Sequence, residues 1–131
     1  MTAGYSGTPL PQKLGVKPDS RVLVDGGPIG FVLEGVDVHT RPGAAPYDIV
    51  LLFAGDLARL RKRWTPLVER LAVAGRLWVC WPKRTSGRQT DLSENDVRDY
   101  GLAHGLVDVK VCAVDETWSG LAFVRRLADR P

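Results

Sequence analysis

Segments with uninterrupted apolar residues are the strongest strand signals in this chain. They lie at residues 21–24, 48–53 and 76–81, and such runs are typical of strands covered on both faces, as in parallel sheets. Apolar and polar residues alternate over residues 36–40, which predicts a further strand. The first two thirds of the chain therefore predict a sheet of mostly parallel strands.

Apolar positions spaced by three and four residues predict a helix after the second apolar run. Asp56 can cap its N-terminus, and one face then carries Leu57, Leu60, Trp64, Leu67, Val68 and Leu71, while Arg59, Lys62, Arg63 and Arg70 point away from that face. Pro66 lies inside the pattern, so we expect a kink or two short helices with Thr65 capping the second. Gly75 is expected to mark the exit from this helix.

The C-terminal third predicts a capped helix followed by a hairpin. Ser93 and Asp96 have the spacing of a capping box, which predicts a helix from about residue 94 to residue 104. Residues 107–114 alternate as a strand, and residues 121–126 return antiparallel to it after a turn. The final strands are therefore expected to form an antiparallel hairpin.

Length and composition indicate a single domain. The chain has 131 residues, of which 44% are hydrophobic and 25% charged, the balance of an ordinary globular protein. We interpret residues 1–20 as an N-terminal arm and residues 21–131 as the domain. Within the arm, Pro9 and Pro11 favour an extended segment, and a short helical turn through Leu14 is expected to follow.

No segment resembles a signal peptide, and no apolar run reaches the length of about 20 residues that spans a membrane, so neither is expected. Cys80 and Cys112 each lie in an apolar, strand-like run, so we expect reduced thiols without a nucleophilic role and a cytoplasmic protein. His39 and His104 have no ligand-like neighbours, and no metal site is expected. His104 is interpreted as a favourable cation at a helix C-terminus.

Positive charge is concentrated in one segment. The net charge is +3, yet residues 59–88 hold nine Lys or Arg against the single acid Glu69. The densest part is a candidate nucleic-acid surface made of Arg59, Arg61, Lys62 and Arg63. Because no aromatic residues interleave these cations, a solvated helix face is the stronger interpretation.

A glycine-rich turn follows the first predicted strand, an arrangement by which α/β folds hold nucleotide-type cofactors. Its candidate cofactor contacts are Asp25, Gly26, Gly27 and Gly30. Pro28 removes one backbone N–H from the turn and adds a ring where a ligand would need space. It also suits the first turn of a helix, but only residues 29–34 remain before Gly35, so we expect a stunted element here.

The order of predicted elements resembles the core of class I S-adenosylmethionine-dependent methyltransferases. More specifically, four motifs resemble an uncharacterised bacterial domain-of-unknown-function family: Tyr5-Ser-Gly-Thr-Pro-Leu10, Lys13-Leu-Gly15, Trp81-Pro-Lys83 and Val107-Asp-Val-Lys-Val-Cys-Ala-Val-Asp-Glu-Thr-Trp-Ser-Gly120. The resemblance implies a three-layer, Rossmann-like α/β fold with a mostly parallel sheet and an antiparallel C-terminal hairpin.

The chain departs from the methyltransferase pattern where the cofactor would bind. Val24 stands where the superfamily usually has an acid, and Pro28 takes the place of the middle glycine. The second strand ends in His39-Thr40-Arg41, which offers donors where an acceptor for the ribose hydroxyls is wanted. Too few residues separate the early strands for full crossovers, so one strand and its helix are expected to be missing and the pocket to be shallow.

Ligands of doubly wound sheets bind outside the carboxyl ends of the strands. That rule predicts a ligand-binding rim made of Arg41, Asp56, Trp81, Lys83, Arg84, Asp115, Glu116 and Trp118. Such a rim could bind a small planar or zwitterionic molecule, with anion binding weighed for Lys83. Structural roles are the alternative: a lid over the core for each tryptophan, a helix cap for Asp56 and a turn-stabilising role for Asp25.

The leading hypothesis is a non-catalytic binding or regulatory domain for a small molecule or a protein, with no catalytic residue and no cofactor. The first alternative is a methyltransferase that binds S-adenosylmethionine in an unusual pose. The second alternative is association with nucleic acid through the basic helix.

Overall fold

A computed structural model describes residues 7–130 of the chain, and these residues build one six-stranded sheet with helices on both faces. The strands are β1 (Val22–Asp25), β2 (Val38–His39), β3 (Tyr47–Phe53), β4 (Leu71–Pro82), β5 (Leu106–Ala113) and β6 (Trp118–Arg125). The helices are α1 (Leu10–Leu14), α2 (Leu57–Val68) and α3 (Glu94–Ala103). Two 3-10 turns, η1 (Arg84–Ser86) and η2 (Leu127–Asp129), complete the elements.

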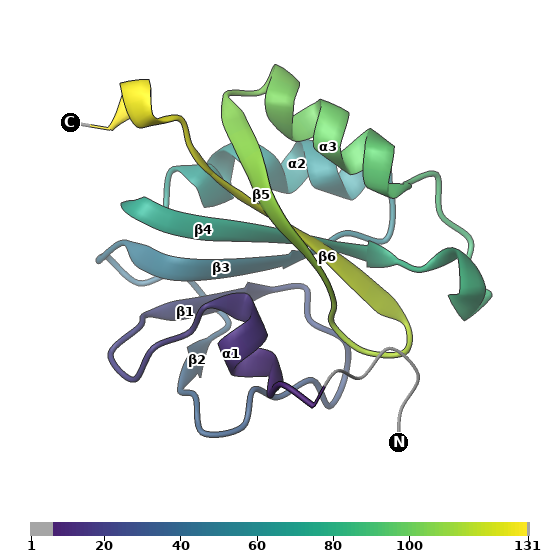
Figure 1. The fold of residues 1–131 in the computed structure, drawn as a ribbon, viewed down its shortest axis with the longest axis horizontal. Coiled ribbons are helices and arrows are strands. Elements are labelled where there is room, and N and C mark those ends of the chain that lie inside the picture. Colours follow the sequence, from purple (N-terminus) through teal and green to yellow (C-terminus); the bar gives the residue numbers. More distant parts are fainter. Residues whose placement is uncertain (1–6, 131) are drawn as a thin grey trace.

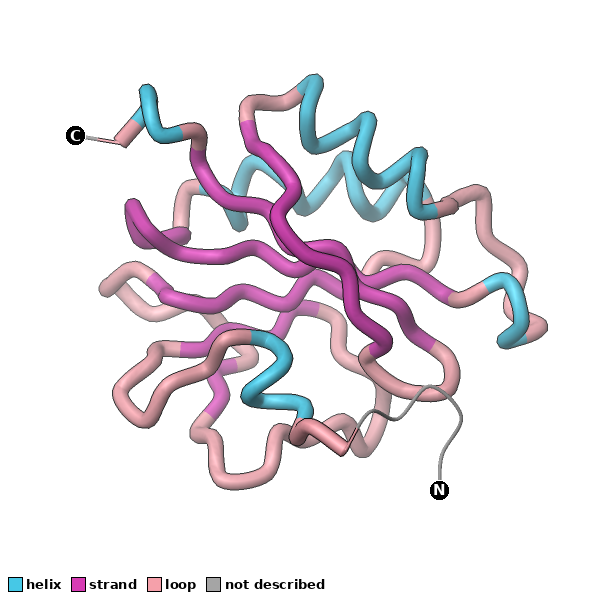
Figure 2. Tube along the Cα trace, viewed as in Figure 1, coloured by secondary structure: helices cyan, strands magenta, loops and turns pink. Residues whose placement is uncertain are grey.

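The strand order is β2-β1-β3-β4-β6-β5, and the pairs β1–β2, β1–β3 and β3–β4 are parallel. β6 runs antiparallel to both of its neighbours, which confirms the predicted C-terminal hairpin. Figure 1 shows β5 and β6 crossing in front of the parallel strands, and Figure 2 shows the loops gathered at the strand ends. The mostly parallel α/β sheet expected from the sequence is therefore the observed one.

The sheet separates two apolar clusters, one on each face. α2 and α3 cover the first face, where Trp64 and Val97 pack against Leu52, Val79 and Phe123 from the strands. α1 and the segment that follows β1 cover the second face, where Leu14 and Leu33 pack with Leu51, Trp78 and Trp118. We call these the α2/α3 face and the α1 face.

The predicted short helical turn before residue 15 is confirmed as α1. Leu14 is completely buried, and its carbonyl oxygen accepts a hydrogen bond from Trp78 Nε1 at 2.9 Å. This part of the predicted arm is therefore packed against the sheet. The predicted extended segment and the motif that begins at Tyr5 lie partly outside the described residues.

Two predictions about the middle of the chain are wrong. α2 is a single helix from Leu57 to Val68 that contains Pro66, so the two short helices do not form; the proline removes only the one helical hydrogen bond that its N–H would donate to the Lys62 carbonyl. The helix ends at Val68, and Gly75 lies inside β4 instead of marking the exit. At Gly75 the strand bulges between two pairs with β3, and a Cβ atom there would come within 2.9 Å of the Tyr47 carbonyl oxygen.

The stunted helix expected at residues 29–34 is not formed. Two separate turns take its place, closed by hydrogen bonds from Phe31 N to the Pro28 oxygen and from Val36 N to the Leu33 oxygen. Gly30 and Gly35 have φ angles of 82° and 76°, which a right-handed helix excludes. The strand after them, β2, is correspondingly short.

Neither edge of the sheet is a long regular strand. β2 has two residues, and β5 carries a bulge between Asp108 and Lys110. The bulge turns these two side chains in different directions, because Asp108 accepts a hydrogen bond from Arg98 of α3 whereas Lys110 donates to the carbonyl of Lys13 in α1. Both helical layers are thereby tied to β5.

Candidate functional site

The carboxyl ends of β1, β3 and β4 meet at one edge of the sheet, as parallel strands require. Four connections cluster there: the glycine turn after β1, residues 54–56, the loop of residues 83–93 and the turn between β5 and β6. The structure places two cavities at this edge. They lie on opposite faces of the sheet and have different linings.

The first cavity lies beside the glycine turn on the α1 face and has a volume of about 290 Å³. Its lining consists of Val24, Gly26, Gly27, Pro28, Phe31, Val38 and Thr40. Most of these surfaces are apolar, and the Thr40 hydroxyl is the side-chain polar group. At this size the cavity is at the lower limit of pockets that bind small molecules, which begin at about 300 Å³.

An arginine of α2 fills the space above the first glycine of the turn. Arg59 Nη2 donates to Asp25 Oδ2 at 2.8 Å, and Arg59 Nε donates to the Phe53 carbonyl at 2.8 Å. A Cβ atom at Gly26 would come within 2.9 Å of Arg59 Cζ. Arg63 Nε adds a second contact to Asp25, at 3.1 Å. The single Asp25 carboxylate thus contacts two guanidinium groups, and the net charge of these three groups is positive.

This arrangement changes the interpretation of the basic helix. As predicted, Arg59 and Arg63 lie outside the buried face of α2, but their long side chains bend back to Asp25 at the end of β1 instead of lying in solvent. Arg61 and Lys62 remain exposed. Of the four cations considered for nucleic-acid binding, two are therefore engaged within the protein.

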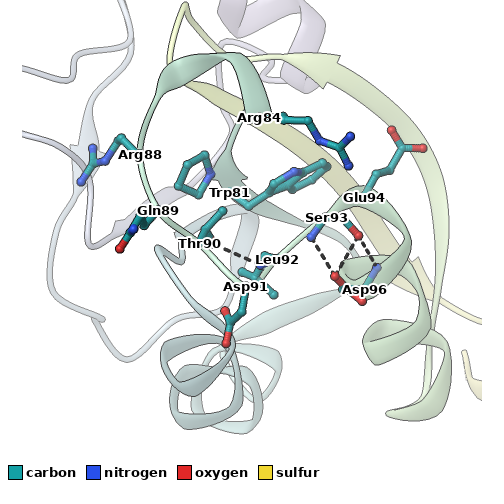
Figure 3. Close-up of a pocket in the computed structure, with 11 residues that line it drawn as sticks. Trp81, Arg84, Arg88, Gln89, Thr90, Asp91, Leu92, Ser93, Glu94 and Asp96 are labelled. Atoms are coloured by element: carbon teal, nitrogen blue, oxygen red, sulfur yellow. Dashed lines mark hydrogen bonds between the residues drawn. The ribbon is translucent and has the colours of Figure 1, made fainter.

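The second cavity lies on the α2/α3 face, where β4 ends, and has a volume of about 850 Å³. Figure 3 shows its lining: Trp81, Pro82, Arg84, Arg88, Gln89, Thr90, Asp91, Leu92, Ser93, Glu94 and Asp96. Trp81, Pro82 and Leu92 are buried and supply its apolar floor, whereas the loop of residues 83–93 and the first turn of α3 supply its polar walls.

Each carboxylate in this lining already has a partner. Asp91 Oδ1 accepts from the backbone N–H of Leu57 at 2.8 Å, at the start of α2. Asp96 accepts from the backbone and hydroxyl of Ser93, which confirms the predicted capping box. Glu94 accepts from Arg98 at 2.8 Å, and hydrogen bonds to Glu94 and Asp108 raise the pKa of the Arg98 guanidinium.

The two arginines of the lining are differently placed. Among the described residues, Arg84 has no hydrogen-bond or ion-pair partner for its side chain. The guanidinium of Arg88 lies over the Trp118 ring at 5.2 Å from the centroid, a contact that leaves its N–H groups free to bind an anion. The lining thus combines two arginines with three hydrogen-bonded carboxylates, and the Arg88 guanidinium is directed to Trp118.

The structure brings the predicted rim residues to the same edge but divides them between the two faces. Trp81 belongs to the α2/α3 face, whereas Trp118 belongs to the α1 face, where its ring meets Phe53 edge to face at 5.2 Å. Trp81 and Arg84 line the second cavity, while Lys83 donates its backbone N–H to Thr117. The predicted rim is thus not one continuous surface.

Of the other four predicted rim residues, two make structural hydrogen bonds and two are exposed to solvent. Asp56 caps α2 by accepting from the Arg59 backbone N–H, as its alternative interpretation proposed. Asp115 accepts from two backbone N–H groups of its own turn. Arg41 and Glu116 are exposed. None of these four residues lines either cavity.

The cysteines and histidines do not form a reactive centre in the described residues. Cys80 and Cys112 are free and buried, and burial raises the pKa of each thiol, so both are neutral near pH 7. His104 stacks on Tyr100, and no cluster of metal-ligating residues is found within residues 7–130. No helix in this part of the chain is long and apolar enough to cross a membrane.

Several residues of the second cavity were not singled out by the sequence. Arg88, Gln89, Thr90 and Asp91 lie in a polar loop without periodicity. Only their position directly after the carboxyl end of a predicted buried strand, together with Lys83 and Arg84, could have drawn attention to them.

Comparison with known proteins supports the fold and leaves the family open. No family model matches the chain, and no curated protein matches it. Among solved structures, the DhpI–SAH complex superposes with a TM-score of 0.51 at 11% sequence identity, covering 72% of this chain and 57% of that one. The chain thus spans a little over half the length of this neighbour. Its fold is a truncated, Rossmann-like α/β fold of the methyltransferase type.

Proposed function

We propose that this protein is a non-catalytic small-molecule-binding domain built on a methyltransferase-like fold. The observation that carries the proposal is the Arg59–Asp25 pair, whose guanidinium lies above Gly26 at the glycine turn. In folds of this type the turn approaches the cofactor through its backbone, so the side chain and a cofactor compete for the same space.

The charge at the turn supports the same proposal. Arg59 and Arg63 both contact Asp25, and this excess of positive charge repels the sulfonium of S-adenosylmethionine. The adjacent cavity of about 290 Å³ is also small for a nucleoside-sized ligand.

The test is isothermal titration calorimetry with S-adenosylmethionine and with SAH, each up to about 1 mM, a concentration that detects binding free energies beyond about −4 kcal/mol. We expect no saturable heat from the unaltered protein. Micromolar binding of either compound, lost on Gly26→Val, would overturn the proposal. Gly87→Val is the matched control, because Gly87 also has a positive φ and lies away from this turn.

A methyltransferase with an unusual cofactor pose is the second candidate, supported by the solved neighbour that holds SAH and by a cavity that touches Gly26 and Gly27. In that case Asp25 would release Arg59 and contact the cofactor itself. Incubation with S-adenosylmethionine labelled at its methyl group and a cell extract would then transfer label to an acceptor. The Asp25→Asn variant would lose this activity, whereas Asp19→Asn, in an exposed position before β1, would retain it.

A further inference from the structure

We propose that the segment from the glycine turn to the end of β2, residues 26–41, is the surface through which two copies of this chain form a two-fold symmetric dimer. The inference goes beyond the proposed function and does not depend on it, because this dimer forms without any ligand. Three observations carry it: exposed apolar side chains, an apolar cavity beside them, and charges of opposite sign at the two ends of the segment. We call residues 26–41 the β1/β2 surface.

The apolar side chains of the β1/β2 surface are turned out of the protein. Ile29 is completely exposed, and Val32 is 75% exposed. Ile29 stands inside the turn closed by the hydrogen bond from Phe31 N to the Pro28 oxygen at 3.0 Å, so the backbone itself keeps its side chain away from the core. Pro28 and Phe31 are half-buried and extend the apolar surface. A group of apolar side chains presented in this way is typical of an interaction surface.

The cavity beside the glycine turn belongs to the same surface. Gly26, Gly27, Pro28 and Phe31 form part of its lining, and its volume of about 290 Å³ is larger than one aliphatic side chain. In a two-fold symmetric dimer every contact occurs twice, so Ile29 of each copy can enter the cavity of the other. A protruding side chain next to an apolar recess thus makes the β1/β2 surface complementary to itself.

Positive charge gathers at the carboxyl ends of β1 and β2. The two strands run parallel, so Arg41, two residues after β2, lies at the same end of the sheet as the Asp25 carboxylate. Arg59 and Arg63 both contact Asp25, and the net charge of these three groups is positive. Arg41 itself is exposed and has no ion-pair partner within residues 7–130. This end of the β1/β2 surface is therefore basic.

Negative charge lies before the start of β2. Glu34 and Asp37 precede this strand, and in the described part of the chain both are exposed without an ion-pair partner. A two-fold axis through the segment places the acidic end of one copy against the basic end of the other. The same two acids oppose the insertion of Ile29 into a membrane of anionic lipids. The pattern of charge therefore fits a second copy of this chain.

The test is sedimentation velocity of the full chain at concentrations from about 1 to about 500 µM. We expect the mass to rise from that of one chain towards that of two, with a Kd of about 50 µM, because an interface centred on one segment is smaller than the standard one of about 800 Å² per partner. Ile29→Asp should abolish association, since it brings an unpaired charge into the interface, and its exposed position leaves the fold intact. Leu127→Asp is the matched control, because Leu127 is an exposed apolar residue of η2, and it should leave the Kd unchanged.

Charge reversal tests the two-fold arrangement itself. Arg41→Glu makes the basic end acidic, and Glu34→Arg/Asp37→Arg makes the acidic end basic, so each variant alone should associate about tenfold more weakly through repulsion of like charges. Mixed in equal amounts, the two variants should associate with each other about as tightly as the unaltered chain does. A defect in folding could not produce this recovery.

Four outcomes would overturn the inference. They are a chain that stays monomeric at about 500 µM, a dimer that Ile29→Asp leaves intact, charge variants that do not associate when mixed, and association with phosphatidylglycerol vesicles in place of self-association. All measurements are made without S-adenosylmethionine or SAH, so their result is separate from the calorimetric test of the proposed function.

Discussion

Gly101 allows α3 to lie directly on the sheet, and its replacement by alanine should be destabilising although alanine is the better helix former. A Cβ atom at this position would come closer than 3.0 Å to three carbon atoms of the Phe123 ring. Phe123 is completely buried, and its ring lies edge to face with Trp64 at 5.5 Å, so it has no free space into which to move.

The expected size follows from two opposing terms. Alanine gains about 1 kcal/mol of helix propensity over glycine in a helix interior. Overpacking a rigid core costs about 1–3 kcal/mol, and the overlap here corresponds to the upper end of that range. The net change for Gly101→Ala is therefore a loss of about 2 kcal/mol in the free energy of unfolding, or about 8 °C in Tm for a domain of this size.

The assay is urea denaturation followed by circular dichroism, with thermal unfolding in parallel. Gly55→Ala is the control, because nothing lies within 4 Å of its added methyl group and Gly55 has no positive φ. It should be neutral or slightly stabilising. The double variant Gly101→Ala/Phe123→Leu should recover part of the loss, because the smaller side chain removes the overlap. Equal or greater stability of Gly101→Ala would refute the packing argument.

Three further predictions concern contacts that hold the layers together. Arg125→Met removes the donor to three backbone carbonyls at the end of α2 and the start of β4, so urea denaturation should show a loss of about 2 kcal/mol, against little change for Arg126→Met. Asp91→Ala removes a cap from α2 and should lower the free energy of unfolding by about 1 kcal/mol, measured as a reduced Tm. Burial raises the pKa of Cys80 and Cys112 above the ordinary 9.0, so the stability that the neutral thiols contribute is complete below pH 9 and falls as the pH rises beyond it. The urea midpoint of Cys80→Ala should therefore decline less above pH 9 than that of the unaltered protein. An equal decline would contradict the raised pKa of the Cys80 thiol.

Local patterns predicted most of the fold correctly. Apolar runs located the buried strands, because strands covered on both faces need continuous apolar sequence, and the Ser93–Asp96 spacing located the start of α3. Predictions failed where contacts distant in sequence decide the structure. Gly75 resembles a helix end, but its small size instead allows β4 to bulge against the Tyr47 carbonyl.

The candidate site was harder to predict than the fold. Helical periodicity correctly places the Cβ atom of Arg59 away from the apolar face of α2, but it says nothing of where a long side chain ends. That side chain meets Asp25, 34 residues earlier in the sequence. Likewise, the strand-end rule identified the correct edge of the sheet, yet it could not show that the sheet itself would separate Trp81 from Trp118.

The two outer strands of the sheet, β2 and β5, also affect how the protein behaves at high concentration. A long, flat outer strand presents free backbone groups to which strands of other molecules can add, and this is a common start of fibril growth. Here one outer strand is only two residues long, and the other is interrupted by the bulge beside Lys110. Both features oppose the addition of further strands, so the open sheet carries its own protection against aggregation.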